Sequence, residues 1–254
     1  MEQIGIFDIN NNTPSLDYKS RLDLYKKTGY SHLAIYLDDS YMKNNEKYKD
    51  IISYAKKIDL KIQHVHLDYK CANDLYSLSL KGIKYYFYLK SKIKQSLKLN
   101  IKYIVIHPSK TNTSPLYNKI AFKRIKKLNS LLDNTSSYLC FENVRNNENL
   151  ELILKLNFKN IKMCFDAGHY NCYCEDDNLL ESYKEKIITT HIHNNFKKDD
   201  HRIMSDGSID WSSIFKHLKN TNRKMDYLEV FPSIGKILSK EEFEYFLKKA
   251  KSGY

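Results

Sequence analysis

The chain has 254 residues, 42% of them hydrophobic, with only 7 Gly and 4 Pro, which is typical of one enzyme-sized domain over residues 1–254 and not of a linker-rich or disordered chain. The net charge of +12 makes nucleic-acid binding a candidate function. The basic residues are almost all lysines, however, whereas bidentate phosphate recognition favours arginine, and they alternate with apolar residues in segments such as 119–128. A solvated helix face is therefore the preferred explanation of the charge.

Membrane and secreted classes are disfavoured by the sequence. No apolar run approaches the roughly 20 residues of a membrane span, and the first residues lack the basic and apolar regions of a signal peptide. The five cysteines include no Cys-x-x-Cys pair, which argues against a disulfide framework. We expect a soluble, cytoplasmic protein with no membrane partner, and the oligomeric state stays open.

Eight short segments rich in β-branched and aromatic residues predict β-strands. In chain order they are residues 4–9, 32–37, 61–67, 103–108, 138–143, 161–166, 188–194 and 226–231. Most are near-continuous apolar runs, the pattern of parallel strands buried on both faces.

Eight amphipathic helices are predicted after these strands, one following each. They are residues 16–27, 46–57, 73–99, 115–133, 147–155, 177–185, 211–219 and 240–250. Asp210 and Ser239 are placed to cap the last two. Strict alternation predicts an α/β fold, a single (β/α)8 barrel with parallel strands and an active site at its C-terminal mouth. Neither Gly-x-Gly-x-x-Gly nor Gly-x-x-x-x-Gly-Lys-Ser/Thr occurs, so an open nucleotide-binding sheet loses its main support.

Nine acidic and histidine residues fall at the carboxyl ends of these strands or in the loops just after them. They are His66, His107, Glu142, Asp166, His169, His191, Asp199, His201 and Glu229. In a barrel, all nine would converge on one mouth. His64 and His66 are two residues apart and share one side of a strand, as do His191 and His193, so periodicity cannot choose within either pair. His32 and His217 lie outside the pattern and are interpreted as structural or surface residues.

Imidazole and carboxylate ligands together suit zinc, with manganese, cobalt or iron as alternatives, better than magnesium. Nine ligands exceed the three or four that one catalytic ion takes, so the surplus suggests two or three ions bridged by carboxylates such as Glu142 and Glu229, and the number stays open between one and three per chain. Cys140 and Cys164 lie inside strand-like runs and are interpreted as buried hydrophobic residues. Cys172 and Cys174 are near the site, and their role stays open.

Taken in order, several motifs resemble the xylose isomerase-like TIM barrel superfamily, which includes endonuclease IV, the tagatose and psicose 3-epimerases and many sugar phosphate isomerases or epimerases. The motifs are His66-Leu67-Asp68-Tyr69, His107-Pro108-Ser109, Phe141-Glu142-Asn143, Asp166-Ala167-Gly168-His169, His191-Ile192-His193-Asn194-Asn195, Asp199-Asp200-His201 and Leu228-Glu229-Val230. The resemblance covers nearly the whole chain.

The resemblance implies a metal held by Glu142, Asp166, His191 and Glu229, with the two glutamates exchanging the proton. It favours His191 over His193 and His66 over His64 as ligands. The five remaining residues would complete the larger set with which endonuclease IV-like proteins hold three zinc ions. They are His66, His107, His169, Asp199 and His201.

Two functions follow from the resemblance. The first is a metal-dependent isomerase or epimerase acting on a sugar or sugar phosphate through a metal-stabilised enediolate, with Glu142 and Glu229 as catalytic residues. The alternative is an endonuclease IV-like phosphodiester hydrolase, an apurinic-site endonuclease with nucleic acid as partner and a multinuclear zinc site. The segment Gly5-Ile6-Phe7-Asp8 departs from the endonuclease pattern, and this departure favours the isomerase. Asn194 and Ser205-Asp206-Gly207 depart from the sugar-enzyme pattern. Lys197 and Lys198 are candidate phosphate contacts.

Overall fold

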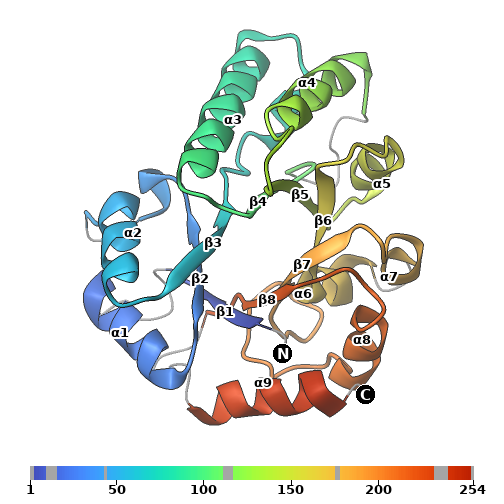
Figure 1. The fold of residues 1–254 in the computed structure, drawn as a ribbon. Helices are drawn as coiled ribbons and strands as arrows, with labels where there is room; N and C mark the ends of the chain where they lie inside the picture. The colour runs from blue at the N-terminus through green and yellow to red at the C-terminus, as the bar shows by residue number, and fades with distance from the viewer. Residues whose placement is uncertain are drawn as a thin grey trace.

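The computed structural model describes residues 3–9, 16–42, 45–110, 117–174, 178–231 and 240–252. Its eight strands form a closed barrel in sequence order, every neighbouring pair is parallel, and β8 pairs with β1 to close it (Figure 1). The strands are β1 Gln3–Phe7, β2 His32–Tyr36, β3 Lys61–His66, β4 Tyr103–Ile106, β5 Tyr138–Glu142, β6 Ile161–Asp166, β7 Ile187–Ile192 and β8 Met225–Leu228. The predicted α/β barrel is confirmed.

Several strands end before the predicted residue. The predicted strand 103–108 ends at Ile106, and the predicted strand 226–231 ends at Leu228. Val230, beyond β8, is nevertheless fully buried. Hydrophobicity indicates burial and not backbone pairing, so the predicted strands extend beyond the last paired residue.

Helices surround the barrel, and all of them except α6 fall in the predicted segments (Figure 1). They are α1 Tyr18–Thr28, α2 Tyr48–Lys57, α3 Leu80–Lys98, α4 Lys119–Ser130, α5 Glu148–Lys155, α6 Ala167–His169, α7 Leu179–Ser182, α8 Trp211–Leu218 and α9 Lys240–Ser252. The carboxylate of Asp210 accepts from the backbone N–H groups of Ser212 and Ser213, as the capping prediction requires. Ser239 lies outside the described residues.

Two departures from the predicted helices bear on the mouth. The predicted helix 73–99 divides into a 3-10 turn, η2 Ala72–Tyr76, and α3, because the Ser79 hydroxyl caps a new helix by accepting from the N–H of Gly82. After β6 the chain forms α6 and then the π-helical turn η3 Tyr170–Cys174, neither of which was predicted. Side-chain capping sets the start of α6 as well, since the Asp166 carboxylate accepts from the His169 N–H at 2.6 Å.

The barrel interior is filled below its C-terminal mouth. Phe7, Tyr103, Cys140, Cys164 and Tyr227 belong to one buried apolar cluster, distinct from the larger one that packs helices on the outside of the sheet. Cys140 and Cys164 are fully buried in strands, as predicted. This packing makes the lower barrel a solid floor, so space for a ligand remains at the mouth.

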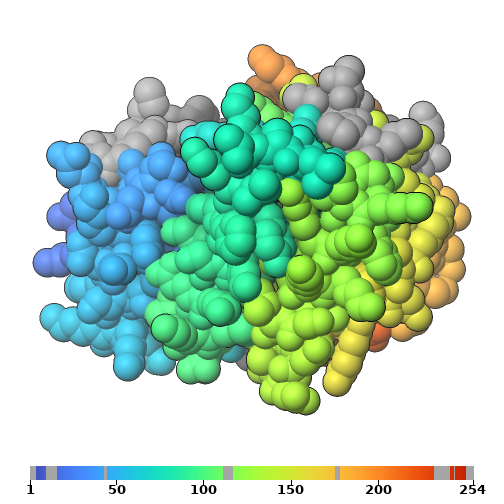
Figure 2. Space-filling view, turned by 90° about the horizontal axis from the view of Figure 1, so that it is seen from above, coloured from blue at the N-terminus to red at the C-terminus, as the bar shows by residue number. Residues whose placement is uncertain are grey.

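The positive charge is concentrated on one outer face. Six of the basic residues lie in α3 and five in α4, and neither helix contains Asp or Glu. The two helices are neighbours, and Figure 2 shows them across the centre of this face. The lysines of these helices are exposed or half-buried, as on a solvated helix face, whereas Arg124 is buried and donates to the Leu75 carbonyl oxygen. Among the described residues, no helix is long and apolar enough to cross a membrane.

Candidate metal centre

The nine predicted residues converge at the C-terminal mouth. His66, Glu142 and Asp166 are the last residues of β3, β5 and β6, and His107 and Glu229 each follow a strand directly. Seven of the nine line one cavity of about 420 Å³, and Asp166 and His191 lie fully buried beneath it. The lining is Tyr36, His66, Tyr69, His107, Lys110, Glu142, Val144, Arg145, His169, Tyr173, Asp199, His201, Glu229 and Phe231.

Three groups of donor atoms form within this cluster, and in each the candidate ligand atoms lie within 4.8 Å of one another. The groups are His66, His107 and Glu142; Glu142, Asp166, His191 and Glu229; and His169, His193, Asp199 and His201. Glu142 belongs to two groups, so its two carboxylate oxygens can serve neighbouring positions, which is the arrangement of a bridging carboxylate.

The central group fits a divalent cation better than it fits hydrogen bonding. Nδ1 of His191 lies 2.8 Å from Oε2 of Glu229, 3.2 Å from Oε1 of Glu142 and 3.7 Å from Oδ2 of Asp166. One N–H cannot satisfy three carboxylates. The hydrogen bond of His191 Nδ1 is made with Oε1 of Glu142, so within the described part of the chain the buried Asp166 Oδ2 and Glu229 Oε2 lie near this nitrogen without a hydrogen bond of their own. A cation held among these four donors would satisfy all of them.

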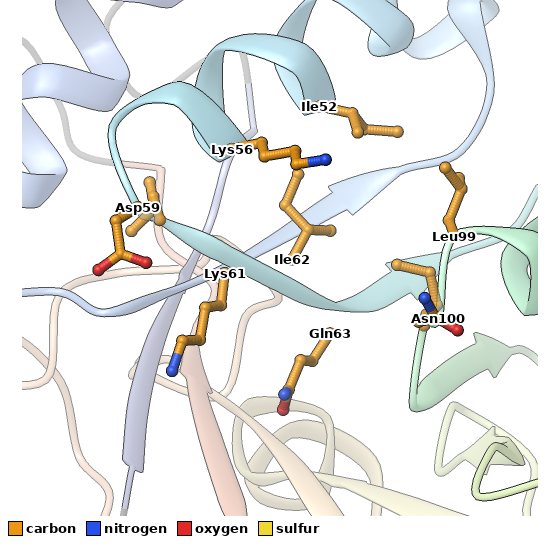
Figure 3. Close-up of a pocket in the computed structure, with 10 residues that line it drawn as sticks. Ile52, Lys56, Asp59, Lys61, Ile62, Gln63, Leu99 and Asn100 are labelled. Atoms are coloured by element: carbon orange, nitrogen blue, oxygen red, sulfur yellow. The ribbon is translucent and has the colours of Figure 1, made fainter.

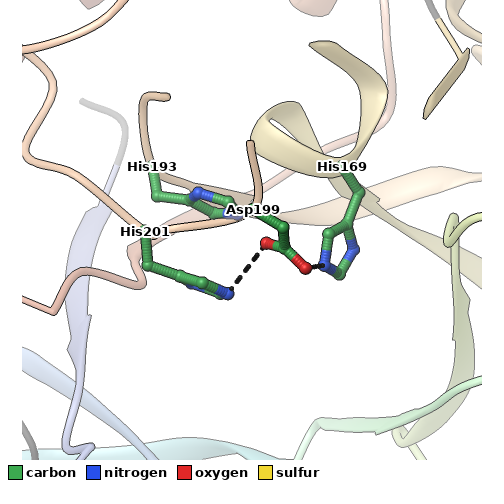
Figure 4. A group of neighbouring side chains, drawn as sticks. All are labelled: His169, His193, Asp199 and His201. Atoms are coloured by element: carbon green, nitrogen blue, oxygen red, sulfur yellow. Dashed lines mark ion pairs between the residues drawn. The ribbon is translucent and has the colours of Figure 1, made fainter. Parts of the chain in front are cut away.

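The two outer groups flank this centre. Nε2 of His66 and Nε2 of His107 lie 3.1 and 3.2 Å from the same Glu142 oxygen, Oε2. On the other side, Asp199 stands between His169 and His201, with its oxygens 3.6 and 3.2 Å from their Nε2 atoms (Figure 4). His193 stacks on His201 with ring centroids 3.9 Å apart.

Backbone carbonyls orient the outer imidazoles. Nδ1 of His66 lies 2.7 Å from the Leu67 carbonyl oxygen, and Nδ1 of His201 lies 3.0 Å from that of Glu229. When Nδ1 donates to such a carbonyl, the Nε2 lone pair is left facing the cavity. Asn143 supports the centre in a similar way, because its side chain accepts from the Asp166 N–H and donates to the Asp166 carbonyl oxygen.

Charge distribution keeps the carboxylates ionised. Burial alone would raise the pKa of Glu142, but His191 and His107 hold it well below its usual value. Burial also opposes ionisation of Glu229, whose pKa is lowered by His191 and then His201. Burial would likewise lower the pKa of His191, yet Cys164, Glu229 and Glu142 raise it well above normal. The pKa of His169 and that of His201 are raised as well, whereas burial lowers that of His107, so cation binding would displace protons from the first two and from His191.

The residue pairs left open by periodicity are separated by the structure. His66 belongs to the first group, whereas His64 lies fully buried beneath it. His191 belongs to the central group, and His193 falls in the third. His193 and Asn143 were not among the predicted site residues. Neither Cys172 nor Cys174 belongs to any of the three groups, and the Cys174 thiol donates to the Val144 carbonyl oxygen at 3.3 Å. Of the residues set aside, His32 is buried at the start of β2 and His217 is exposed on α8.

Beneath the centre, His64 contacts the buried side of His191. Their Nε2 atoms are 2.9 Å apart, and Nδ1 of His64 lies 3.5 Å from Oγ1 of Thr189. If Nδ1 of His191 is to hold a cation, its proton sits on Nε2 and His64 must accept it. We expect His64→Leu to weaken metal binding by about 10- to 100-fold.

Equilibrium competition with a metal chelator measures that effect. His64→Gln is the matched variant, because its amide oxygen can still accept from His191, and it should retain most of the affinity. Equal affinities in His64→Leu and the unchanged protein would contradict this role.

A second cavity, of about 310 Å³, lies at the opposite end of the barrel (Figure 3). It is lined by the first residues of β3, including Lys61, by α2, and by the turn at Asn100 that leads to β4. Asp59 is the one carboxylate in its lining, and no histidine or cysteine lies there. Clustered titratable side chains therefore distinguish the C-terminal mouth from this cavity.

The closed parallel barrel and the clustered histidines and carboxylates at its mouth define an α/β-barrel protein with groups of side chains that could hold a metal ion. The family model described as xylose isomerase-like TIM barrel matches residues 22–249. The chain therefore belongs to this family.

Two curated relatives and several solved structures are similar to this chain. The uncharacterized protein MJ1614 of Methanocaldococcus jannaschii is 28% identical over 148 residues, 53% of this chain and 57% of that protein. The uncharacterized protein y4fM of Sinorhizobium fredii is 39% identical over 64 residues, 24% of this chain and only 21% of its own length. An L-ribulose 3-epimerase has a TM-score of 0.75 at 14% identity, and a zinc-bound IolI protein has 0.68 at 19%. Both alignments cover 100% of this chain and 96% of the other. At these identities the structural likeness establishes the fold.

Proposed function

We propose that this protein is a metal-dependent isomerase or epimerase of a small sugar or sugar derivative. The observation that carries the proposal is the pair Glu142 and Glu229, which enter one cavity from β5 and from the end of β8 and both contact His191. Two ionised carboxylates on separate strands can remove a carbon-bound proton and return it at a neighbouring position. The fold shared with an L-ribulose 3-epimerase supports this chemistry.

The cavity suits a single small substrate. Its volume of about 420 Å³ lies in the range of small-molecule pockets and is too small for a polymer to enter. Tyr36 and Phe231 form apolar parts of its wall, and the Tyr69 ring stacks on that of His107 at 4.8 Å. These rings would exclude water from the reacting carbon while the imidazoles and carboxylates bind hydroxyl groups.

Zinc is the first choice of ion, with manganese, cobalt or iron as alternatives, in one to three positions. When bound, such an ion would polarise a substrate carbonyl and its adjacent hydroxyl. Glu142 and Glu229 would then carry the proton, and His191 would fix the position of both carboxylates. The site's own residues thus supply proton transfer and orientation.

The two outer groups favour a second candidate, an endonuclease IV-like phosphodiester hydrolase. A proton-transfer enzyme needs only the central group, whereas an in-line displacement at phosphorus uses several ions to stabilise the attacking and leaving oxygens. The charge distribution supports the first candidate instead, because the lysine-rich helices α3 and α4 lie on the outside of the barrel, whereas Lys110 and Arg145 are the two basic residues in the described lining of the cavity.

One experiment separates the two candidates. Metal-loaded protein is incubated in deuterated water with a panel of ketoses, aldoses and their phosphates, and in parallel with a DNA duplex that carries an abasic site. We expect deuterium at a carbon beside the carbonyl and no nicking. Nicking without exchange would overturn the isomerase proposal. Metal analysis of the same sample tests the outer groups, since fewer than two ions per chain would contradict a multinuclear centre.

A further inference from the structure

Two basic side chains share the cavity with the proposed ligands. Lys110 and Arg145 both line it. Each follows a proposed ligand by three residues, Lys110 after His107 and Arg145 after Glu142. The two loops leave adjacent strands, since β4 pairs with β5 in parallel along its whole length. The spacing therefore places two cations on the same side of the mouth.

Both loops are held by local contacts. The backbone N–H of Lys110 donates to Oδ1 of Asn73 at 2.8 Å. The guanidinium carbon of Arg145 lies 4.9 Å from the ring centroid of Tyr173, which also lines the cavity. The first contact fixes the backbone from which the Lys110 side chain extends, and the second places the Arg145 guanidinium over an aromatic ring while its outer N–H groups can still reach a ligand.

The carboxylates of the cavity do not neutralise these cations. Glu142, Glu229 and Asp199 each contact histidines, at distances of 3.1, 2.8 and 3.2 Å. Among the described residues, neither Lys110 nor Arg145 forms an ion pair. Two basic side chains that line a small cavity match an oxyanion in charge and in hydrogen-bond donors, whereas a neutral sugar needs no cation.

We propose that Lys110 and Arg145 form an oxyanion subsite, so that the substrate is an anionic sugar derivative, a phosphate ester or a sugar acid, and not a neutral sugar. The identity of the substrate rests on the proposed function, whereas the binding of an anion by these two residues does not. The proposed contacts with phosphate differ from Lys197 and Lys198, the candidates given by the sequence. Lys197 and Lys198 are exposed and do not line this cavity, although Asp199 beside them does.

Binding of inorganic phosphate to the metal-loaded protein tests the subsite by calorimetry. Lys110→Ala and Arg145→Ala should each weaken binding by about tenfold, with the metal content unchanged. Both side chains are exposed, so the variants should fold. Lys197→Ala is the matched control and should bind as the unchanged protein does. Equal phosphate affinity in all variants would show that phosphate contacts the ions alone and would overturn the subsite.

Further probes distinguish the source of the oxyanion. Gluconate represents a carboxylate, and a short DNA duplex represents a phosphodiester. Tighter binding of inorganic phosphate than of gluconate would assign a phosphate ester, and the reverse would assign a sugar acid. Binding dominated by the duplex and dependent on Lys110 and Arg145 would overturn the sugar-derivative assignment.

Failure of the subsite and failure of the proposed function give different results. If no sugar exchanges deuterium but phosphate binding still depends on Lys110 and Arg145, the function fails and the subsite stands. If neutral ketoses exchange as well as their phosphates do, and phosphate binding is unchanged in both variants, the function stands and the subsite fails.

Discussion

Glu142→Gln is expected to reduce the rate of substrate proton exchange by about 10³-fold or more. Glutamine keeps the shape of the side chain but removes its charge and one of its two acceptor oxygens. Glu142 lies 3.1 Å from His66, 3.2 Å from His107 and 3.2 Å from His191, so the substitution affects two of the three donor groups at once. It removes the proposed proton carrier and also a carboxylate that could hold metal at two neighbouring positions.

Solvent deuterium exchange measures the rate of substrate proton exchange, and metal analysis after dialysis measures the loss of bound metal. Glu148→Gln is a suitable control, because Glu148 is an exposed residue of the first turn of α5 and belongs to no donor group. We expect the control to match the unchanged protein in rate and metal content. A Glu142→Gln protein that keeps its metal and retains activity within tenfold would contradict the role of Glu142.

The barrel could be predicted because each of its units carries its own signal. Apolar runs such as 161–166 have the length and composition of buried parallel strands, and Asp210 marks a helix start by its capping side chain. The division of 73–99 could not be predicted as easily. The segment is amphipathic throughout, and the break depends on Ser79 capping α3 while η2 packs against α4.

The site was predictable as a set and less so in its details. Strand ends in a parallel barrel share one face, so residues as distant in sequence as His66 and Glu229 had to meet there. The parallel register then sets Asp166 beside His191, which no local pattern reveals. His64 and His66 have the same periodicity and differ only in depth along the strand. Whether each residue lies in the packed interior or at the cavity depends on how far the buried side chains fill the barrel toward its mouth. That depth is set by packing between strands that are distant in sequence.

A buried ion cluster beside the first strand has the largest expected effect on stability. The guanidinium of Arg21, on α1, donates to both carboxylate oxygens of Asp8 at 2.9 and 3.0 Å and to those of Glu46 at 3.0 and 2.9 Å. The side chains of Arg21 and Asp8 are each 1% exposed. Burial would lower the pKa of Arg21, but the hydrogen bonds that it donates to Asp8 and Glu46 raise it above its usual value. The guanidinium therefore stays charged and ties the end of β1 to α1 and to the segment that precedes α2.

We expect Arg21→Met to lower the free energy of unfolding by about 3–5 kcal/mol, because two buried carboxylates lose their counter-charge. Urea unfolding at neutral pH measures the change. Arg202→Met is the matched control, since Arg202 pairs with Asp200 and Asp206 at the surface and its side chain is 41% exposed, so a much smaller change is expected. If both variants unfold at the same urea concentration, the buried cluster does not anchor β1. If only Arg21→Met is destabilised while metal binding persists, the cluster supports the barrel independently of the metal centre.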